Sequence, residues 1–225
     1  MKQFLSRLAL FATLAGASAT AAAIEPFTAQ YQANYMGMQG QGRMTLQPSG
    51  GDRWTYRFTV DGNIATLSQS TVFEERDGSY RPLSGRDSSR VLIKKVDKNA
   101  AYDWDKGVAT WTGDVKADRA GPVKLRAGDM DAMLVNLAIV RDVAAGKPLR
   151  YRMVDDGRVK QLDYTVAGQE RVKVGGKSHQ ATKVVATDGD KQTIAWVVDG
   201  LPVPARLLQK RDGKDEMDLR LKSVD

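Results

Sequence analysis

WTYRFTVDG, residues 54–62, alternates large apolar side chains with polar ones and then ends in an Asp-Gly pair. Successive side chains of a β-strand point to opposite faces of a sheet, so this alternation predicts a strand with one buried face. Glycine adopts a positive φ at little cost, and Asp-Gly is therefore typical of a tight turn between antiparallel strands. The segment predicts one arm of a β-hairpin.

The same two features recur along the chain. Period-two alternation returns at residues 31–35, 162–166 and 217–221. Turn dipeptides separate such runs at residues 61–62, 77–78, 156–157, 175–176, 188–189 and 212–213. Strands joined by short turns are generally neighbours in the sheet. We therefore predict a mainly β protein, with a curved antiparallel sheet that forms a half-barrel or a barrel-like meander.

One segment follows a helical period instead. From residue 129 to 145 (DMDAMLVNLAIVRDVAA) the apolar residues recur in steps of three and four, which is the spacing of one helix face. Asp129 or Asp131 can cap its N-terminus, and Gly146 followed by Pro148 ends it. Few charges lie on the opposite face. We predict one principal helix near residues 129–145, buried against the sheet.

Residues 1–23 have the composition of a secretory signal peptide. Lys2 and Arg7 precede a short apolar run and a stretch of small residues. The run is shorter than the roughly 20 apolar residues that a spanning helix requires, and no later run approaches that length. We predict cleavage after Ala23, export to the periplasm without a transmembrane segment, and one β-rich domain formed by residues 24–225.

The composition excludes several kinds of chemistry. The chain has no cysteine, which rules out disulfides, thiolate metal sites and cysteine nucleophiles. Its one histidine, His179, follows a Gly-Gly turn. The neighbouring Ser178 would point to the opposite face of a strand, so the two cannot act as base and nucleophile. We predict no catalytic residue and no cofactor.

Three pairs of aspartates could serve as a divalent-cation site or as a catalytic carboxylate pair. They are Asp129 with Asp131, Asp155 with Asp156, and Asp188 with Asp190. The first pair opens the predicted helix, where negative charge is favourable, and the other two flank turn glycines, where aspartate is common. None has the longer ligand pattern of a calcium loop. We predict no metal site.

The formal net charge of +7 over 225 residues is a modest excess. It is not concentrated into the basic patch that nucleic-acid binding requires, so we predict no nucleic-acid partner. Residues 86–98 (RDSSRVLIKKVDK) are locally basic. The favoured interpretation is a solvated strand face with lysines that protect the sheet, and contact with an anionic lipid or another polyanion is the alternative.

Several segments, in order and spacing, resemble the exported bacterial proteins of domain-of-unknown-function family 3108. These segments are YQANYMGMQGQGR at 31–43, DMDAMLVNL at 129–137, TIAWVVD at 193–199 and LPVPARL at 201–207. The resemblance implies a β-rich fold related to the half-barrels of periplasmic lipoprotein carriers, in which a sheet wraps around a helical plug and an apolar groove. It implies no established activity.

These observations predict a non-enzymatic binding or carrier protein for an apolar or amphiphilic envelope ligand, such as a lipid or lipoprotein. Aromatic residues are only 7% of the chain, too few to fill a wide concave sheet. We expect Tyr56, Phe58, Leu162 and Tyr164 to line the groove. The alternatives are a partner-binding envelope factor without a cavity and a polysaccharide hydrolase with two carboxylates roughly 5 to 9.5 Å apart.

Overall fold

The computed structural model describes residues 24–63, 65–76 and 78–225, and the signal peptide predicted at residues 1–23 lies outside them. Strands make up most of the described chain. They are β1 (Phe27–Tyr35), β2 (Met38–Pro48), β3 (Arg53–Gly62), β4 (Ala65–Arg76), β5 (Ser79–Val91), β6 (Lys94–Asp103), β7 (Val108–Gly113), β8 (Val123–Lys124), β9 (Arg150–Asp155), β10 (Arg158–Asp163), β11 (Thr165–Val174), β12 (Lys177–Asp188), β13 (Lys191–Val197), β14 (Arg206–Arg211) and β15 (Lys214–Val224). The helices are the short 3₁₀ segment η1 (Ala117–Arg119) and the α-helix α1 (Ala132–Ala144).

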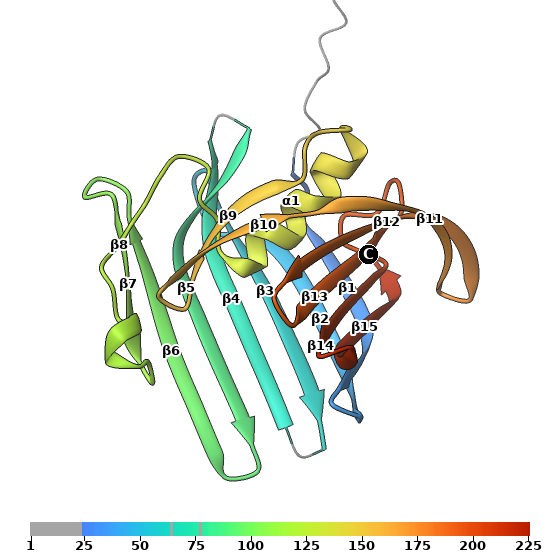
Figure 1. The fold of residues 1–225 in the computed structure, drawn as a ribbon, viewed down its shortest axis with the longest axis horizontal. Helices are drawn as coiled ribbons and strands as arrows, with labels where there is room; N and C mark the ends of the chain where they lie inside the picture. Colours follow the sequence, from blue (N-terminus) through green and yellow to red (C-terminus); the bar gives the residue numbers. More distant parts are fainter. Residues whose placement is uncertain (1–23, 64, 77) are drawn as a thin grey trace, which may run out of the picture.

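Thirteen strands form one antiparallel sheet, in the order β11-β12-β13-β14-β15-β1-β2-β3-β4-β5-β6-β7-β8. Strands β9 and β10 form a separate hairpin. The two edge strands, β11 and β8, do not pair with each other, so the sheet formed by the described strands stays open. These features confirm the predicted mainly β fold with a curved antiparallel meander (Figure 1).

The first and last strands of the chain are neighbours at the middle of the sheet. Tyr31 on β1 lies opposite Gly42 on β2 and opposite Leu221 on β15. The sheet therefore has two arms, β2 to β8 on one side and β15 to β11 on the other (Figure 1). Between them in sequence come α1 and the β9–β10 hairpin, which lie across the sheet: α1 contacts β4, β5 and β13, and β10 contacts β12.

The α-helix begins where the sequence indicates. Asp131 is the N-cap, and its carboxylate accepts a hydrogen bond from the Leu134 amide at 2.8 Å. Gly146, just after the C-cap, has a φ of 61°, a conformation that glycine takes readily. The prediction of one principal helix near residues 129–145 is confirmed, with Asp131 rather than Asp129 as the cap. No helix within the described ranges is both long and apolar enough to span a bilayer.

The main hydrophobic core lies between α1 and the sheet. On the helix, Leu134 and Ile139 are fully buried, and they share one cluster with Tyr56 and Phe73 of the first arm and Leu219 of β15. The polar side of the helix is also covered. Asp142 is buried and accepts hydrogen bonds from Arg141 at 2.8 Å and from the Tyr151 hydroxyl at 3.1 Å, partners that a carboxylate removed from water requires.

Leu134→Ala should therefore lower the free energy of unfolding by about 2–5 kcal/mol, because it removes apolar contacts and leaves a cavity between helix and sheet. Urea unfolding followed by fluorescence measures the change. Val159→Ala is the matched control, since Val159 is 44% exposed and its truncation should change stability by less than about 0.5 kcal/mol. Equal effects of the two substitutions would contradict the assignment of this core.

Candidate functional site

The inner face of the sheet is filled at one end and open at the other. On β3 the inward residues are Tyr56, then Phe58, then Val60. Tyr56 lies opposite Thr71 of β4, and the Thr71 hydroxyl donates to the carboxylate of Asp131 at the start of α1. The N-terminus of α1 thus covers the row of side chains that contains Tyr56 and Thr71. The next rows toward the β3–β4 turn, beginning with Phe58, lie beyond it.

The uncovered rows surround a cavity of about 830 Å³. This volume falls within the roughly 300–1,000 Å³ that small-molecule sites occupy. Strands β1 to β5, the first turns of α1, the β9–β10 hairpin and strands β12 to β15 all contribute to its wall. Its apolar residues include Met44, Phe58, Val60, Leu67, Met133, Leu162, Tyr164, Leu207 and Leu219.

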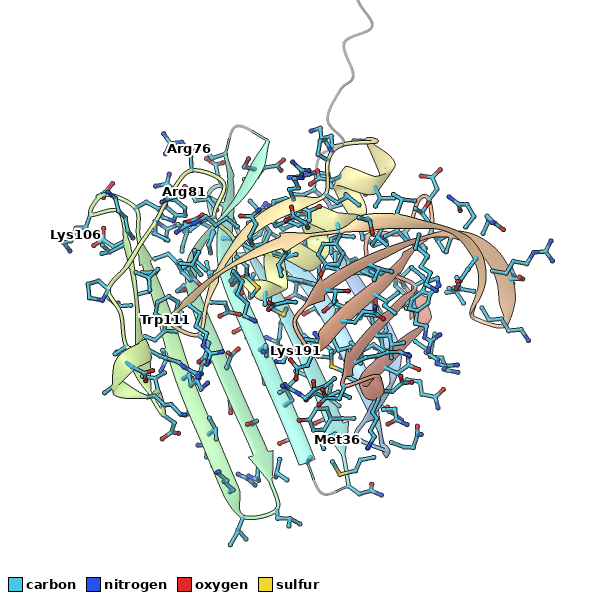
Figure 2. All side chains as sticks on the ribbon, viewed as in Figure 1. Met36, Arg76, Arg81, Lys106, Trp111 and Lys191 are labelled. Atoms are coloured by element: carbon cyan, nitrogen blue, oxygen red, sulfur yellow. The ribbon has the colours of Figure 1, made fainter. Side chains whose placement is uncertain are left out.

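The cavity opens at the end of the sheet that carries the β1–β2, β3–β4 and β5–β6 turns. Its wall is buried near α1, at Met133 and Phe58, and exposed near these turns, at Tyr35, Asn63 and Val91. Figure 2 shows Met36 and Lys191 on this side of the molecule, away from Arg76 and Arg81 at the opposite ends of the strands.

Three of the four residues expected to line a groove belong to the cavity wall. Phe58 comes from β3, Leu162 from β10, and Tyr164 from the residue that joins β10 to β11. Tyr56 is not in the wall. It is fully buried under the N-terminus of α1, and its hydroxyl contacts the sulfur of Met44 at 3.1 Å.

Sequence reasoning missed the charged part of the wall. Arg158, Lys160 and Lys191 line the cavity together with Asp156 and Asp188. Lys160 and Asp188 form an ion pair between the β9–β10 hairpin and β12. The turns that hold these residues are evident in the sequence. Nothing local in the sequence shows that the two turns face the same cavity.

Two carboxyl groups, those of Asp131 and Asp155, lie near the N-terminus of α1, and of the two only Asp155 belongs to the cavity wall. Burial raises the pKa of Asp131 to about 6, although the hydrogen bonds from Thr71 and the Leu134 amide oppose this shift. Burial also raises the pKa of Asp155 to about 7, and the charges of Asp131 and Asp87 add to the effect. Within the described residues, no three His, Cys, Asp or Glu side chains are grouped so as to hold a metal ion.

Asp156 differs from Asp155, its neighbour in sequence. Its carboxylate accepts hydrogen bonds from Lys98 at 2.7 Å and from Arg119 at 2.9 Å. These bonds and charges hold the pKa of Asp156 below its usual value although burial raises it. Asp155 therefore resists ionisation, whereas the adjacent Asp156 ionises readily. Such a combination is found at acid–base sites and also in structural ion networks.

A family model described as "Protein of unknown function (DUF3108)" matches residues 27–220 of the chain. The chain belongs to this family. The match extends from the start of β1 into β15, so it includes every element that surrounds the cavity. It confirms the family resemblance seen in the sequence. A search of curated proteins gives no match.

One solved structure similar to this DUF3108 member supports the fold. A crystal structure of a β-barrel-like protein of domain of unknown function DUF1849 from Brucella abortus has a TM-score of 0.54 and 14% identity, over 89% of this chain and 97% of that one. The crystal structure of MucB matches with a TM-score of 0.34 and 10% identity, over 89% of this chain and 52% of that one. The DUF3108 chain thus spans about half of the MucB chain.

The raised pKa values in this DUF3108 member predict a pH-dependent stability. A carboxyl group whose pKa is higher in the folded state than in the unfolded chain, where aspartate titrates near 3.9, binds its proton more tightly when folded. The stability that this tighter binding gives the folded state is fully present below about pH 4. It is lost as the pH rises through the folded pKa, which is about 6 for Asp131 and about 7 for Asp155. The Tm should therefore fall between pH 5 and pH 8.

Asp155→Asn tests the assignment, because a neutral amide cannot ionise but can still accept the hydrogen bond from the Asp156 amide. Differential scanning calorimetry should show a flatter dependence of Tm on pH for this variant than for the native chain. Carboxyl groups with a lowered pKa, such as Asp156, titrate below this pH window and do not obscure the effect. A Tm of the native chain that rises from pH 5 to pH 8 would contradict the raised pKa values.

Proposed function

We propose that this chain is an exported, non-enzymatic periplasmic protein that binds or carries an apolar or amphiphilic molecule, such as a lipid or a lipoprotein acyl chain, in the cavity between α1 and the hairpin turns. The cavity is the observation that carries the proposal. Its volume exceeds what a structural void in a packed core would have, since native interiors leave few spaces larger than a water molecule.

The chemistry of the wall favours an amphiphile over a purely apolar ligand. Strands β2 to β4 supply methionine, phenylalanine, valine and leucine side chains, which suit a hydrocarbon chain. Arg158 and Lys191 line the cavity, and within the described residues neither forms an ion pair, in contrast to Lys160. They provide positive charge for a polar or anionic head group near the mouth.

The hydrolase is the second candidate, and the raised pKa of Asp155 at the inner end of the cavity favours it. Both nearby carboxylates already accept hydrogen bonds that support the fold, however. Asp131 caps the helix and accepts from Thr71, and Asp155 accepts from the Asp156 amide at 2.8 Å. A catalytic role would make Asp155→Asn lose activity on an envelope polysaccharide. A carrier with this substitution should keep its ligand affinity.

Ligand binding can be tested by narrowing the cavity. Val60→Trp places a large ring in open space and should lower the affinity for a fluorescent fatty-acid analogue at least about tenfold, with little change in Tm. Thr59→Trp is the matched control, since Thr59 is the next residue on β3 and points away from the cavity, and it should bind as the native chain does. Native mass spectrometry should show excess mass on the native chain only when amphiphile is bound.

Phe58→Ala widens the same wall and gives a second measurement. It should change the size preference among fatty-acid analogues as well as lower stability by a few kcal/mol. The carrier function would be contradicted if Phe58→Ala changed only stability and if the native chain showed no bound mass and did not bind the analogue. These results would favour a partner-binding factor.

Export is a separate part of the proposal. Intact mass spectrometry of the protein from a periplasmic fraction should give a chain that begins at Ile24, because the signal peptide is removed after Ala23. Recovery of the full-length chain from the cytoplasm as the main species would contradict the localisation.

A further inference from the structure

Large exposed apolar side chains gather at two hairpin turns. At the β5–β6 turn, Leu92 is 67% and Ile93 101% exposed, and Val91 beside them is 44% exposed. At the β1–β2 turn, Met36 is 66% and Tyr35 43% exposed. These five make up most of the exposed large hydrophobic residues in the described part of the chain. An apolar cluster of this kind indicates a contact surface.

The two turns border the mouth of the cavity. The antiparallel meander places the β1–β2, β3–β4 and β5–β6 turns at the same end of the sheet, and Tyr35 and Val91 both line the cavity. Figure 1 shows the β5–β6 hairpin projecting beyond its neighbours at this end. The exposed side chains of Leu92 and Ile93 are therefore the outermost apolar groups near the mouth.

Positive charge surrounds the β5–β6 turn. Arg90, Lys94 and Lys95 are exposed, and the strand register places Arg90 opposite Lys95 and Val91 opposite Lys94. None of the three cations forms an ion pair within the described residues, whereas the acid that follows them, Asp97, is paired with Arg86 at 2.7 Å. The turn thus carries uncompensated positive charge directly behind its apolar tip.

The backbone of the turn does not call for an apolar residue. Leu92 has a φ of 54°, in the left-handed region where glycine or asparagine is favoured and leucine is uncommon. A solvated strand face, the interpretation that the sequence favoured for residues 86–98, explains the cations but not a leucine in this conformation followed by a fully exposed isoleucine. Neither the turn geometry nor the packing of the fold accounts for the apolar tip.

We propose that the β5–β6 hairpin docks this protein on an anionic lipid bilayer. Leu92 and Ile93 enter the interface between head groups and acyl chains, while Arg90, Lys94 and Lys95 contact anionic head groups. Apolar groups backed by cations are the combination that binds proteins reversibly to such surfaces. Docking in this orientation turns the cavity mouth toward the membrane. The proposal concerns a surface separate from the cavity and holds whatever ligand the cavity takes.

Vesicle sedimentation tests the proposal, with residues 24–225 and vesicles of phosphatidylcholine alone or mixed with phosphatidylglycerol. The protein should sediment with the mixed vesicles, and much less with phosphatidylcholine alone or at high salt, because the attraction is screened. Absence of binding to the mixed vesicles would overturn membrane docking and leave a protein partner as the occupant of the tip. Equal binding to both vesicle types would overturn the role of the cations.

Leu92→Gly combined with Ile93→Ser removes the apolar tip and suits the turn, since glycine accepts the positive φ. This variant should keep its Tm and lose vesicle partitioning by about tenfold or more. Val166→Ser is the matched control, because Val166 is 62% exposed on β11, away from the β5–β6 turn, and it should bind as the native chain does. Native binding by the folded tip variant would overturn the proposal.

Lys94→Gln combined with Lys95→Gln tests the charges. Each cation near an anionic surface contributes about a fivefold gain in partitioning, so the double variant should bind roughly 25-fold more weakly. Lys173→Gln with Lys177→Gln in the β11–β12 hairpin makes the same charge change elsewhere and should have a much smaller effect. Val60→Trp, which narrows the cavity, should bind vesicles normally, so failure of cavity binding and failure of docking can be told apart.

Discussion

The carboxylate of Asp131 joins the helix to the sheet, and the shape of the interior depends on where it does so. It caps α1 through the Leu134 amide and also accepts a hydrogen bond from Thr71 on β4. The Asp131 carboxylate is removed from water, and a buried carboxylate without hydrogen-bond donors is strongly unfavourable. The two donors therefore fix the position of the helix on the sheet. The helix N-terminus is thereby fixed above the row of β3 and β4 that contains Tyr56.

The cavity follows from the difference in length between the helix and the strands. A helix of 13 residues is about 20 Å long and about 10 Å wide, whereas β4, with 12 residues, spans roughly 40 Å. Whatever its direction across the sheet, a single helix leaves part of such a face uncovered. With α1 fixed at the Tyr56 row, the uncovered part lies toward the hairpin turns, and few aromatic side chains are present to fill it.

The spacing of apolar residues revealed the helix and many of the strands, because these are local properties of the chain. The alternation at residues 162–166 was misleading, since it crosses the junction between β10 and β11, and Val166 is 62% exposed. Alternation placed Tyr56 and Phe58 on one face of β3, which is correct, but it could not show that Tyr56 packs under the helix while Phe58 lines the cavity. Alternation also could not predict the charged part of the cavity wall. Arg158 and Lys191 are far apart in sequence and line one cavity only because the β9–β10 hairpin folds over the second arm. Long-range contacts of this kind have no signature in a single sequence.

The turns of the first arm differ between the two ends of the sheet, although their backbone requirements are alike. Gly50 and Gly107, in the β2–β3 and β6–β7 turns away from the cavity mouth, take positive φ values with the residue best suited to them. Met36 and Leu92, in turns near the mouth, take positive φ values of 50° and 54° with large apolar side chains that remain exposed. Folding alone would favour glycine or asparagine at all four positions. The apolar residues therefore occur at the end where the cavity opens, and not at the end where the helix closes the interior.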